Sequence, residues 1–353
     1  MEETKTKTIW HKVLKIALRC LIVLVQTVAL AAVALYCVMF VLAKGPSPTA
    51  KELFVLSVRE TSAMYWLADL FFTKEEIAVM EQGDGEEEFE DTDTSLIQRP
   101  AENPDTDEPQ MDAWGLVDED GDGIIVDRVI GDGFTGYMMV VLDPSRVVMG
   151  SCPEDYDRKG YTVAEMVGKF DAVAGINGGG FEDVDGMGDG SQPDTMVVYE
   201  GQVYYAYKGA GQGFVGFDYD GILHVGRPSP DEIKAKNIRF GVSFGPVLVA
   251  NGEAVGSFAS GINPRTGIGQ RSDGAILMLV IDGRQVSSIG ATYADMQEIF
   301  LEYGAVNACN LDGGSSSVMW YQGDYINHCA SVTGIRHMPT TFLVLKEGVT
   351  GNE

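Results

Sequence analysis

The stretch Asn310-Leu311-Asp312-Gly313-Gly314-Ser315-Ser316-Ser317 places one carboxylate in a run of residues with little side-chain bulk. It directly follows Ala305–Asn310, whose small and apolar residues predict a short buried strand. Glycines at the end of a strand let the backbone approach a ligand closely, although the same composition also occurs in an ordinary tight turn. The neighbouring loops of the chain help to decide between these two interpretations.

Three other segments combine an Asn, Asp or Arg with glycines beside a predicted strand. They are Ile176–Phe181 (INGGGF), Asn263–Gly269 (NPRTGIG) and Ile281–Arg284 (IDGR). Arg265 and Arg284, set among small residues, are suited to bidentate capture of a phosphate or carboxylate. Because ligand sites gather where strands end, we expect these clusters to form one shared site.

The pattern from residue 124 onwards predicts an α+β fold with a mixed, twisted β-sheet and a few packed helices. Short β-branched runs alternate with Gly, Asp and Asn. The expected strands are Ile124–Ile130, Gly136–Leu142, Ala172–Ile176, Met196–Tyr199, Gln202–Tyr207, Phe214–Phe217, Gly245–Val249, Ala275–Asp282, Ala305–Asn310 and Thr341–Leu345. The expected helices are Thr162–Phe170, Ser229–Lys236 and Thr292–Tyr303.

An N-terminal membrane anchor precedes this domain. The run Cys20–Ala43 contains only two polar residues, Gln26 and Thr27, and its length suffices to span a bilayer core of about 20 apolar residues. Lysines and arginines concentrate in the preceding tail, 1–19, which places the N-terminus in the cytoplasm and the later domain outside the cell membrane. The alternative is a cleaved signal peptide, whose apolar core would be unusually long.

Two segments connect the anchor to the domain. Residues 44–80 have a helical but charged pattern, which predicts a stalk that lies on the membrane or supports oligomerisation through 49–80. Residues 81–123 are rich in acids, Gly and Pro, and their composition predicts a disordered linker. The linker contributes much of the formal charge of −27, which argues against nucleic acid as a partner.

No cofactor is expected. Asp118–Ile124 copies the first half of a calcium loop, but the twelfth position is Val129 rather than the required Glu. An acidic turn is therefore the expected structure, with calcium at Asp118, Asp120 and Asp122 as the alternative. The five cysteines show no metal-binding spacing, and free thiols are expected, with a Cys309–Cys329 bridge as the alternative. Gly211–Gly216 matches a dinucleotide motif without its strand–turn–helix context, so we give it no role.

The ordered set of motifs resembles the phosphodiester glycosidase family, which includes the uncovering enzyme of lysosomal enzyme maturation and many bacterial exopolysaccharide-related proteins. The similarity spans 124–346, followed by a tail at 347–353. It rests on INGGGF, Phe244–Leu248, PRTGIG, IDGR and NLDGGSS in this order, with further likeness at Gly136–Val147 and Arg336–Val344. One position departs from the family pattern, because Thr195 follows Pro193-Asp194 where a Gly is usual.

The resemblance implies hydrolysis of a sugar-1-phosphate diester at the anomeric carbon. Together with the predicted anchor, this gives the expectation of a membrane-anchored, extracytoplasmic hydrolase that acts on a cell-surface polysaccharide or glycoconjugate. Asp312 is then expected to be the nucleophile or general base, and Asp282 the second carboxylate or an orienting group. The residues expected to bind the sugar phosphate are Asn177, Gly178, Gly179, Arg265, Arg284, Asn310, Gly313, Gly314, Ser315 and Ser316.

Two other classes of function remain open at this stage. One is a catalytically silent module that binds or assembles an exopolysaccharide or wall polymer. The other is a stalked scaffold that binds no sugar phosphate. The sugar, the alcohol beyond the phosphate and the stereochemical outcome are not determined by these motifs.

Overall fold

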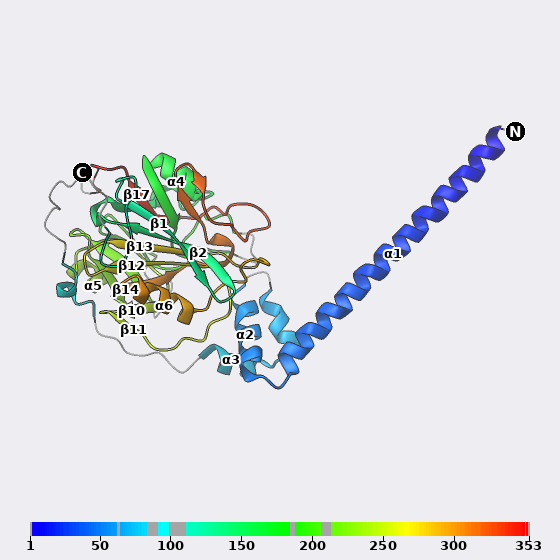
Figure 1. Cartoon of the computed structure of the whole chain (residues 1–353), viewed down its shortest axis with the longest axis horizontal. Coiled ribbons are helices and arrows are strands. Elements are labelled where there is room, and N and C mark those ends of the chain that lie inside the picture. Colours follow the sequence, from blue (N-terminus) through cyan, green and yellow to red (C-terminus); the bar gives the residue numbers. More distant parts are fainter. Residues whose placement is uncertain are drawn as a thin grey trace.

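The structure, a computed structural model, describes residues 2–61, 64–82, 91–98, 111–183, 188–205, 213–349 and 351, with the side chains of the first helix described from Trp10 onwards. A long helix, α1 (Glu2–Lys44), leads through a group of short helices into a β-rich domain (Figure 1). The short helices are α2 (Pro48–Arg59), η1 (Tyr65–Leu70) and α3 (Lys74–Gln82). We call the described residues 48–61 and 64–82, which include these helices and the turns between them, the elbow.

The domain contains three sheets, and every strand pairing described is antiparallel. Sheet I has the order β1 (Ile124–Gly131), β2 (Phe134–Val141), β13 (Ile276–Ile281), β12 (Arg265–Arg271), β14 (Ala305–Leu311), β10 (Val247–Ala250), β11 (Glu253–Ala254). Sheet II has the order β16 (Asp324–Tyr325), β15 (Met319–Tyr321), β4 (Ala172–Asn177), β17 (Thr340–Leu345), β3 (Val147–Ser151). Sheet III has the order β6 (Gln202–Tyr204), β5 (Val197–Tyr199), β9 (Ile238–Ser243), β7 (Phe214–Asp218), β8 (Leu223–Gly226).

The three sheets share one central apolar core. Sheet I contributes Met278 and Ile268, sheet II contributes Ile176 and Phe342, and sheet III contributes Val242. Strand β13 is buried along its whole length, because its alternate side chains enter this core on one face and a second core on the other. A strand covered on both faces has a continuous apolar sequence, as ILMLVI does.

Each sheet carries one helix on its outer face. α6 (Tyr293–Glu302) covers sheet I, α4 (Val163–Lys169) covers sheet II, and α5 (Pro230–Ala235) packs on sheet III through Ile233. All three helices begin with a capping box, in which a Ser or Thr and an acid three residues later bond each other's backbone. Shorter helical turns occur at η2 (Thr94–Leu96), η3 (Pro144–Arg146), η4 (Pro153–Asp155) and η6 (Gly314–Ser316).

The α+β class predicted from the sequence is confirmed, whereas the single mixed sheet is wrong: three antiparallel sheets are present. The pattern missed β12 because its sequence, RTGIGQR, is neither apolar nor alternating in the ordinary way. Its glycines serve packing. A Cβ on Gly267 would lie 2.8 Å from Met296 and 2.9 Å from Phe300, so bare backbone is needed under α6.

Part of the predicted disordered linker is instead packed on the domain. Trp114 stacks on Arg271, whose guanidinium carbon lies 3.9 Å from the ring centroid, and Asp112 forms an ion pair of 2.6 Å with the same arginine. Residues 91–98 are also attached, since Gln98 N donates to Ser272 O. The acids of these parts have ordered partners, which composition alone did not reveal. Residues 83–90 and 99–110 lie outside the described residues.

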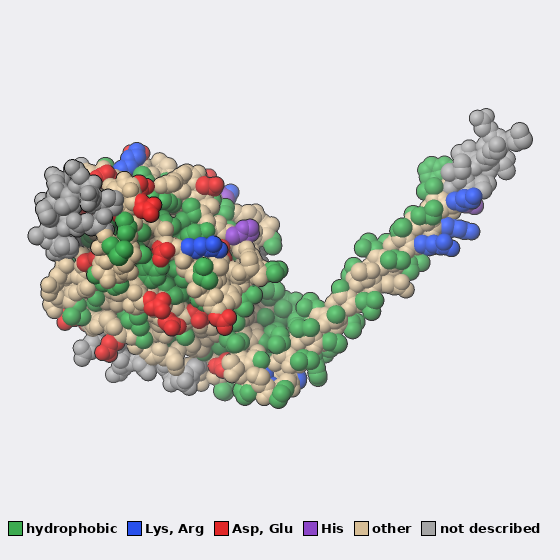
Figure 2. Space-filling model, viewed as in Figure 1, with side chains coloured by type: hydrophobic (Ala, Val, Ile, Leu, Met, Phe, Trp, Pro, Cys, Tyr) green, Lys and Arg blue, Asp and Glu red, His purple; other side chains and the backbone are tan. Residues whose placement is uncertain are grey.

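The elbow packs against the C-terminal end of α1. Ala43 is fully buried there with Val55 of α2, Ala68 of η1 and Phe71. Among the residues that the structure describes, one helix is long and apolar enough to cross a membrane, at Trp10–Lys44, with a mean hydropathy of 2.5. Its large apolar side chains are exposed along most of its length (Figure 2), whereas Met39 and Ala43 pack against the elbow.

Candidate active site

Antiparallel pairing brings the predicted motifs to one edge of sheet I. Arg265, the first residue of β12, pairs with Ile281 at the end of β13, and Thr266 pairs with Leu311 at the end of β14. The start of β12 therefore lies between the ends of its two neighbours. The clusters around residues 265, 282 and 312 meet there, as the sequence predicted.

Asn177 fixes the aspartate turn to sheet II. Its Nδ2 donates to the backbone oxygen of Asp312 at 2.6 Å, and its Oδ1 accepts from Thr266 Oγ1 at 2.9 Å and from Val318 N at 3.2 Å. The side chain is buried. We therefore assign Asn177 a positioning role rather than the substrate contact expected from the motif.

The glycines of the INGGGF loop are also needed for packing. A Cβ on Gly178 would lie 2.7 Å from Thr340 Oγ1, and one on Gly179 would lie 3.0 Å from Val242. Gly178 O accepts from the backbone N of Asp312 at 3.1 Å. These two residues let the end of β4 come close enough to hold the turn that carries Asp312.

Asp312 lies in a desolvated environment with other charged groups. Loss of hydration raises its pKa to about 7; a hydrogen bond with Ser316 and the charge of Arg336 oppose the shift, and Asp194 and Asp183 add to it. A carboxyl group with a pKa near neutrality exchanges protons readily at physiological pH, which is typical of catalytic acids and bases.

Three of these charged neighbours were not among the predicted site residues. Arg336 donates to Asp183 at 2.7 Å and to Ser315 Oγ at 3.2 Å. Asp194 lies against Gly180, where a Cβ would come within 2.7 Å of its carboxylate. The sequence offered one signal, since Asp194 directly precedes Thr195, the position that departs from the family pattern. Arg336 lies far along the chain, and only the fold brings it here.

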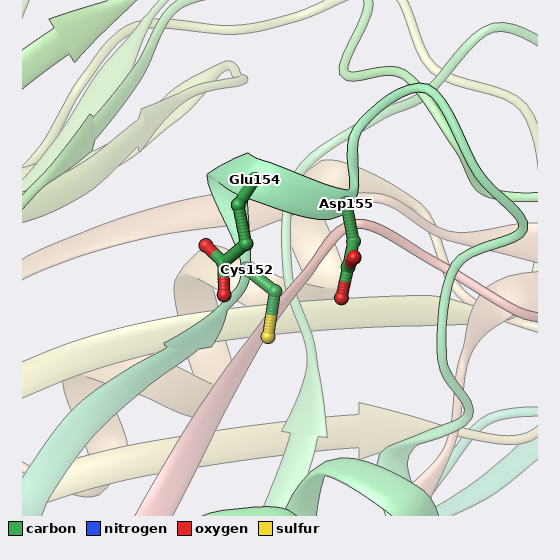
Figure 3. Close-up of side chains that lie close together, drawn as sticks. All are labelled: Cys152, Glu154 and Asp155. Carbon is green, nitrogen blue, oxygen red and sulfur yellow. The ribbon is translucent and has the colours of Figure 1, made fainter.

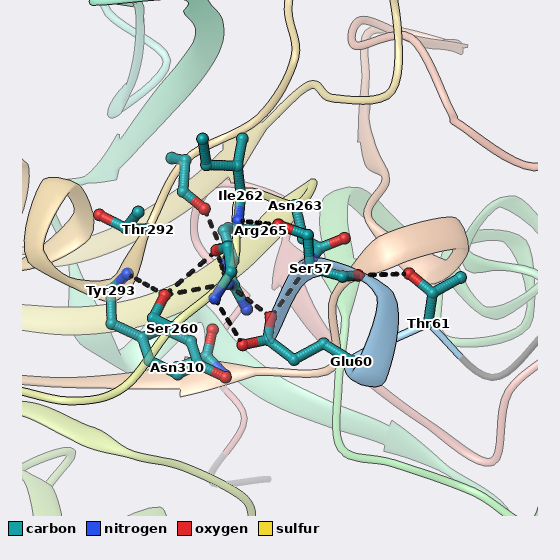
Figure 4. Close-up of polar contacts among 12 residues, drawn as sticks. Ser57, Glu60, Thr61, Ser260, Ile262, Asn263, Arg265, Thr292, Tyr293 and Asn310 are labelled. Carbon is teal, nitrogen blue, oxygen red and sulfur yellow. Dashed lines mark hydrogen bonds and ion pairs between the residues drawn. The ribbon is translucent and has the colours of Figure 1, made fainter. Parts of the chain in front are cut away.

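Arg265 is held by the elbow (Figure 4). Its guanidinium donates to Glu60 Oε2 at 2.7 Å, to Ser260 Oγ at 3.1 Å and to Gly261 O at 2.5 Å, and its guanidinium carbon lies 4.2 Å from the Tyr293 ring centroid. The arginine side chain is 5% exposed. Glu60, the C-cap residue of α2, is thus the counterion of a buried charge.

The same glutamate accepts hydrogen bonds from the loop before β12. Its Oε1 accepts from Gly261 N at 2.8 Å, and its Oε2 also accepts from Asn263 Nδ2 at 2.9 Å. Together with Arg265, these donors surround the carboxylate of Glu60, and we call this set of donors the anion pocket. No sequence signal connected residue 60 with this loop, because about 200 residues separate them.

Arg284 lies between this anion pocket and the aspartate turn. It donates to Thr61 Oγ1 at 2.8 Å and to Asn263 Oδ1 at 3.0 Å, and its guanidinium would be 3.2 Å from a Cβ on Gly314. Desolvation and the charge of Arg265 lower its pKa, while Glu60 and Asp312 oppose this effect. Its backbone φ of 58° is uncommon for a residue other than glycine, and such strain clusters at functional sites.

Glycines 313 and 314 permit this approach. Gly314 has φ of 60°, in the left-handed region, and donates its N–H to Pro264 O, while a Cβ on Gly313 would lie 2.8 Å from the same oxygen. The turn can therefore lie directly on the loop before β12. This is the close approach that the bare sequence of the turn predicted, although part of it serves protein rather than ligand.

Asp282 lies on the other side of the turn. Its Oδ1 accepts from His328 N at 2.9 Å and from Asn327 Nδ2 at 3.1 Å, and the same Nδ2 donates to Ser317 O. Burial raises the pKa of Asp282. Among the contacts described, none joins Asp282 to Asp312, so the geometry favours the orienting role over that of a second reacting carboxylate.

Asn310 supports the turn from below. Its Nδ2 donates to Gly245 O at 2.7 Å, and its buried Oδ1 has no hydrogen-bond partner among the described residues. It lies near Tyr293 and Ser260 (Figure 4). All five cysteines are free thiols, as expected.

Within the described part of the chain, two groups of side chains have the spacing of metal ligands. Asp118, Asp120 and Asp122 bring carboxylate oxygens within 4.8 Å of one another, but both oxygens of Asp118 already accept from backbone N–H groups. Cys152, Glu154 and Asp155 form the other group (Figure 3), and Lys169 lies 3.8 Å from Asp155. An ammonium at this position competes with a cation, so we assign no metal there.

We expect EDTA or added calcium to leave the rate of the reaction proposed below within about twofold, because Arg265 and Arg284 can supply charge stabilisation at this site. The measurement is the initial rate before and after chelation, with EDTA-treated protein refilled with calcium as the control. A loss of activity that calcium restores would show that the acids at 118, 120 and 122 bind a functional ion.

Comparison with known proteins agrees with the motifs and the fold. Residues 170–345 match the phosphodiester glycosidase family. The SPbeta prophage-derived uncharacterized protein YomE of Bacillus subtilis (strain 168) is 33% identical over 196 residues, which are 53% of this chain and 29% of that protein. The chain thus spans less than a third of the length of that relative.

Among solved structures, the fold resembles the zebrafish N-acetylglucosamine-1-phosphodiester alpha-N-acetylglucosaminidase catalytic domain auto-inhibited by pro-peptide. The TM-score is 0.54 at 18% identity, covering 71% of this chain and 87% of that one. A hypothetical protein from Synechocystis gives a TM-score of 0.46 at 16% identity, covering 64% and 62%.

The fold and site define an α+β domain of antiparallel sheets, with an aspartate turn and two arginines at one sheet edge. Residues 170–345 form a domain of the phosphodiester glycosidase family.

Proposed function

We propose that the protein is a membrane-anchored, extracytoplasmic phosphodiester glycosidase that hydrolyses a sugar-1-phosphate diester. The observation that carries this proposal is an anion pocket beside an aspartate of raised pKa. Arg265, Asn263 and Gly261 N bind a carboxylate in that pocket, and Arg284 connects it to the turn of Asp312. A pocket in which a planar guanidinium binds a carboxylate can also bind a phosphate, because both anions fit the same donor geometry.

The reaction needs charge stabilisation more than proton donation. The leaving group is a phosphate monoester, which departs readily near neutral pH, in contrast to the alcohol released by ordinary glycosidases. Arg284 and the donors of the anion pocket would hold this group. Asp312 would act from the sugar side as nucleophile or general base, and Asp282 would keep the turn in place through Asn327.

The proposal is tested with the full chain in nanodiscs and a panel of methyl diesters of α-glucose-, α-galactose- and α-N-acetylglucosamine-1-phosphate. We expect release of reducing sugar and methyl phosphate from at least one of them. Binding of a diester without product release would indicate a silent binding module. The proposal would be contradicted if wild type and Glu60→Ala both failed to bind and to cleave every diester of the panel.

In this conformation the elbow closes the anion pocket. The carboxylate of Glu60 occupies the place that we assign to the substrate phosphate. The hydroxyl of Thr61 accepts a hydrogen bond from Arg284, so that N–H group is also engaged. The zebrafish catalytic domain is auto-inhibited by its pro-peptide. We infer a comparable closed state here, in which substrate must displace Glu60.

Glu60→Ala is therefore expected to increase kcat/KM by about 10- to 100-fold, because an attached competitor acts at a high effective concentration. The same change should lower the melting temperature, since Arg265 loses its buried partner, and breaking such a pair costs about 3–5 kcal/mol. Kinetics and thermal unfolding are measured on the same samples. Arg59→Ala, which removes an exposed pair with Glu81, is the matched control. Lower stability without faster turnover would show that the contact is only structural.

The membrane anchor is part of the proposal. α1 has the length and apolar composition of a span, and basic residues precede its apolar part. The orientation is tested by adding protease to intact spheroplasts and asking whether the C-terminal domain is digested. Digestion from outside is expected.

A further inference from the structure

The elbow carries apolar side chains on its outer surface as well as in its core. Met64, Tyr65, Trp66 and Leu70 are between 41% and 56% exposed. Figure 2 shows the apolar surface of α1 continuing onto the elbow, while acidic side chains are spread over the visible face of the domain. Trp and Tyr beside aliphatic residues are typical of surfaces that lie at the interface of a membrane.

The elbow contacts α1 within its apolar run, about two turns before the end of the helix, as well as at the end itself. The ring of Phe71 lies 5.7 Å from that of Tyr36, and Phe54 lies 6.0 Å from Phe71. Tyr36 precedes Ala43 by seven residues, which is about 10 Å along a helix. Lys44, at the end of α1, lies with its ammonium 4.7 Å from the Phe72 ring centroid. If α1 spans the membrane, Phe71 and the adjoining Leu70 therefore lie at the level of the lipid interface.

The same segment also enters the active site. Thr61 accepts from Arg284, and Thr61 O accepts from Met64 N at 2.9 Å. Met64, an exposed apolar residue of the elbow, is thus hydrogen-bonded to Thr61, a residue that contacts the site. The domain lies beside the end of α1, with the elbow between the two (Figure 1). If α1 spans the membrane, the anion pocket therefore lies next to the bilayer surface.

We infer that the substrate of this site is membrane-embedded: a sugar-1-phosphate diester whose alcohol is a long-chain lipid. The inference rests on the proposed function and specifies its substrate class. The elbow residues 64–72 rest in the interface, so that a phosphate at headgroup level can reach Arg284 and the anion pocket while its lipid chain stays in the bilayer.

The hydrolysis balances without a further reactant. The bond between the anomeric carbon and the phosphate oxygen breaks, and its electrons remain on the phosphate. The oxygen of one water molecule bonds to the anomeric carbon and loses a proton. The products are the free sugar, released to the aqueous side, and a lipid phosphate monoester that stays in the membrane.

The test uses the full chain in nanodiscs and pairs of diesters that share one sugar-1-phosphate, one with a C55 polyprenyl alcohol in the bilayer and one with methanol in solution. Trp66→Asp/Leu70→Asp introduces charge into the interface, whereas Tyr219→Asp, at the turn between β7 and β8, is the control for an exposed aromatic residue. All rates are also measured in the Glu60→Ala background to remove competition by the elbow.

We expect the polyprenyl diester to be cleaved at least 10-fold faster than the methyl diester. The double variant should lose this preference and keep the methyl rate within twofold, and Tyr219→Asp should change neither. Cleavage of the methyl diester with no preference for the lipid, or equal effects of the double variant on both, would overturn the inference and leave the proposed function intact. If neither the polyprenyl diester nor the methyl diester were cleaved, both the inference and the proposed function would be contradicted.

Depth of insertion gives an independent readout. Lipids brominated at acyl carbons 6 and 7 quench tryptophan at the interface. The emission of Trp66, taken as the difference between wild type and Trp66→Phe in nanodiscs, should fall by at least half. Unchanged emission would place the elbow in water and contradict the inference.

Discussion

Asp312→Asn is expected to lower kcat by about 10³- to 10⁵-fold, because it removes the carboxylate that attacks or takes a proton while keeping the shape of the side chain. The backbone contacts of the turn with Asn177 and Gly178 do not involve this side chain and should persist. Single-turnover kinetics on the best diester of the panel measures the effect. Ser331→Ala, in an exposed loop, serves as a control for handling. Full activity of Asp312→Asn would exclude the assignment.

The raised pKa of Asp312 predicts the pH dependence of the rate. As nucleophile or base the carboxyl group must be ionised, so kcat/KM should rise with pH through about 7 and then level off. A rate that falls with pH through the same value would instead identify Asp312 as a proton donor.

The same pKa predicts an effect on stability. The folded state holds the proton of Asp312 up to about pH 7, whereas the unfolded chain releases it near the ordinary value of about 3.9. Stability therefore falls as pH rises between these values, because the folded state then binds more protons. Asp312→Asn should stabilise the protein by about 1–3 kcal/mol at pH 8, where the buried carboxylate is ionised, and by much less at pH 4, where the folded state holds it protonated. Denaturant unfolding at the two pH values measures this difference.

The second large effect is expected for Arg284→Met, which should lower kcat/KM by about 10²- to 10³-fold through loss of charge on the departing phosphate. Arg284→Lys keeps the charge but not the planar donors, so it should recover only part of the loss. The melting temperature should change little, because Arg284 is partly exposed and its partners Thr61 and Asn263 are neutral.

Comparison with Arg239→Met controls for the general loss of an arginine, because Arg239 lies in sheet III beside Tyr219. Steady-state kinetics on a methyl diester separates KM from kcat. If Arg284→Met raised KM alone, the arginine would bind ground state and transition state equally. Unchanged kcat/KM would rule out a role for Arg284 at the phosphate.

The sequence predicted the strand-end motifs and their convergence, because each motif combines a buried run with a polar, glycine-rich turn. It also predicted helices α4, α5 and α6, whose capping residues are local signals. Strand β12 was not predicted, because its glycines are equally typical of a surface turn. Their packing role is visible only in the structure, where they lie beneath Phe300. The assembly of three sheets around one core depends on contacts between distant segments, for which one sequence offers no signal.

The roles of individual site residues were harder to predict. Asn177 and Gly178 belong to a ligand-like motif, yet their contacts hold the aspartate turn. Glu60 was assigned to a stalk because its neighbours are helical and charged, and its contact with Arg265 spans the chain. Arg336 was part of the similarity, but its position near Asp312 follows from the packing of sheet II. Motifs located the site, whereas charges contributed from distant segments became visible only in the fold.

The central claim is that water attacks the sugar carbon rather than phosphorus. It is tested most directly by letting the protein hydrolyse a methyl diester that it accepts as substrate in water enriched in ¹⁸O, and examining the methyl phosphate produced by ³¹P NMR. We predict that methyl phosphate carries no isotope shift and that the freshly released sugar carries the label. Label in the phosphate would mean cleavage at phosphorus and would contradict the assignment of a glycosidase.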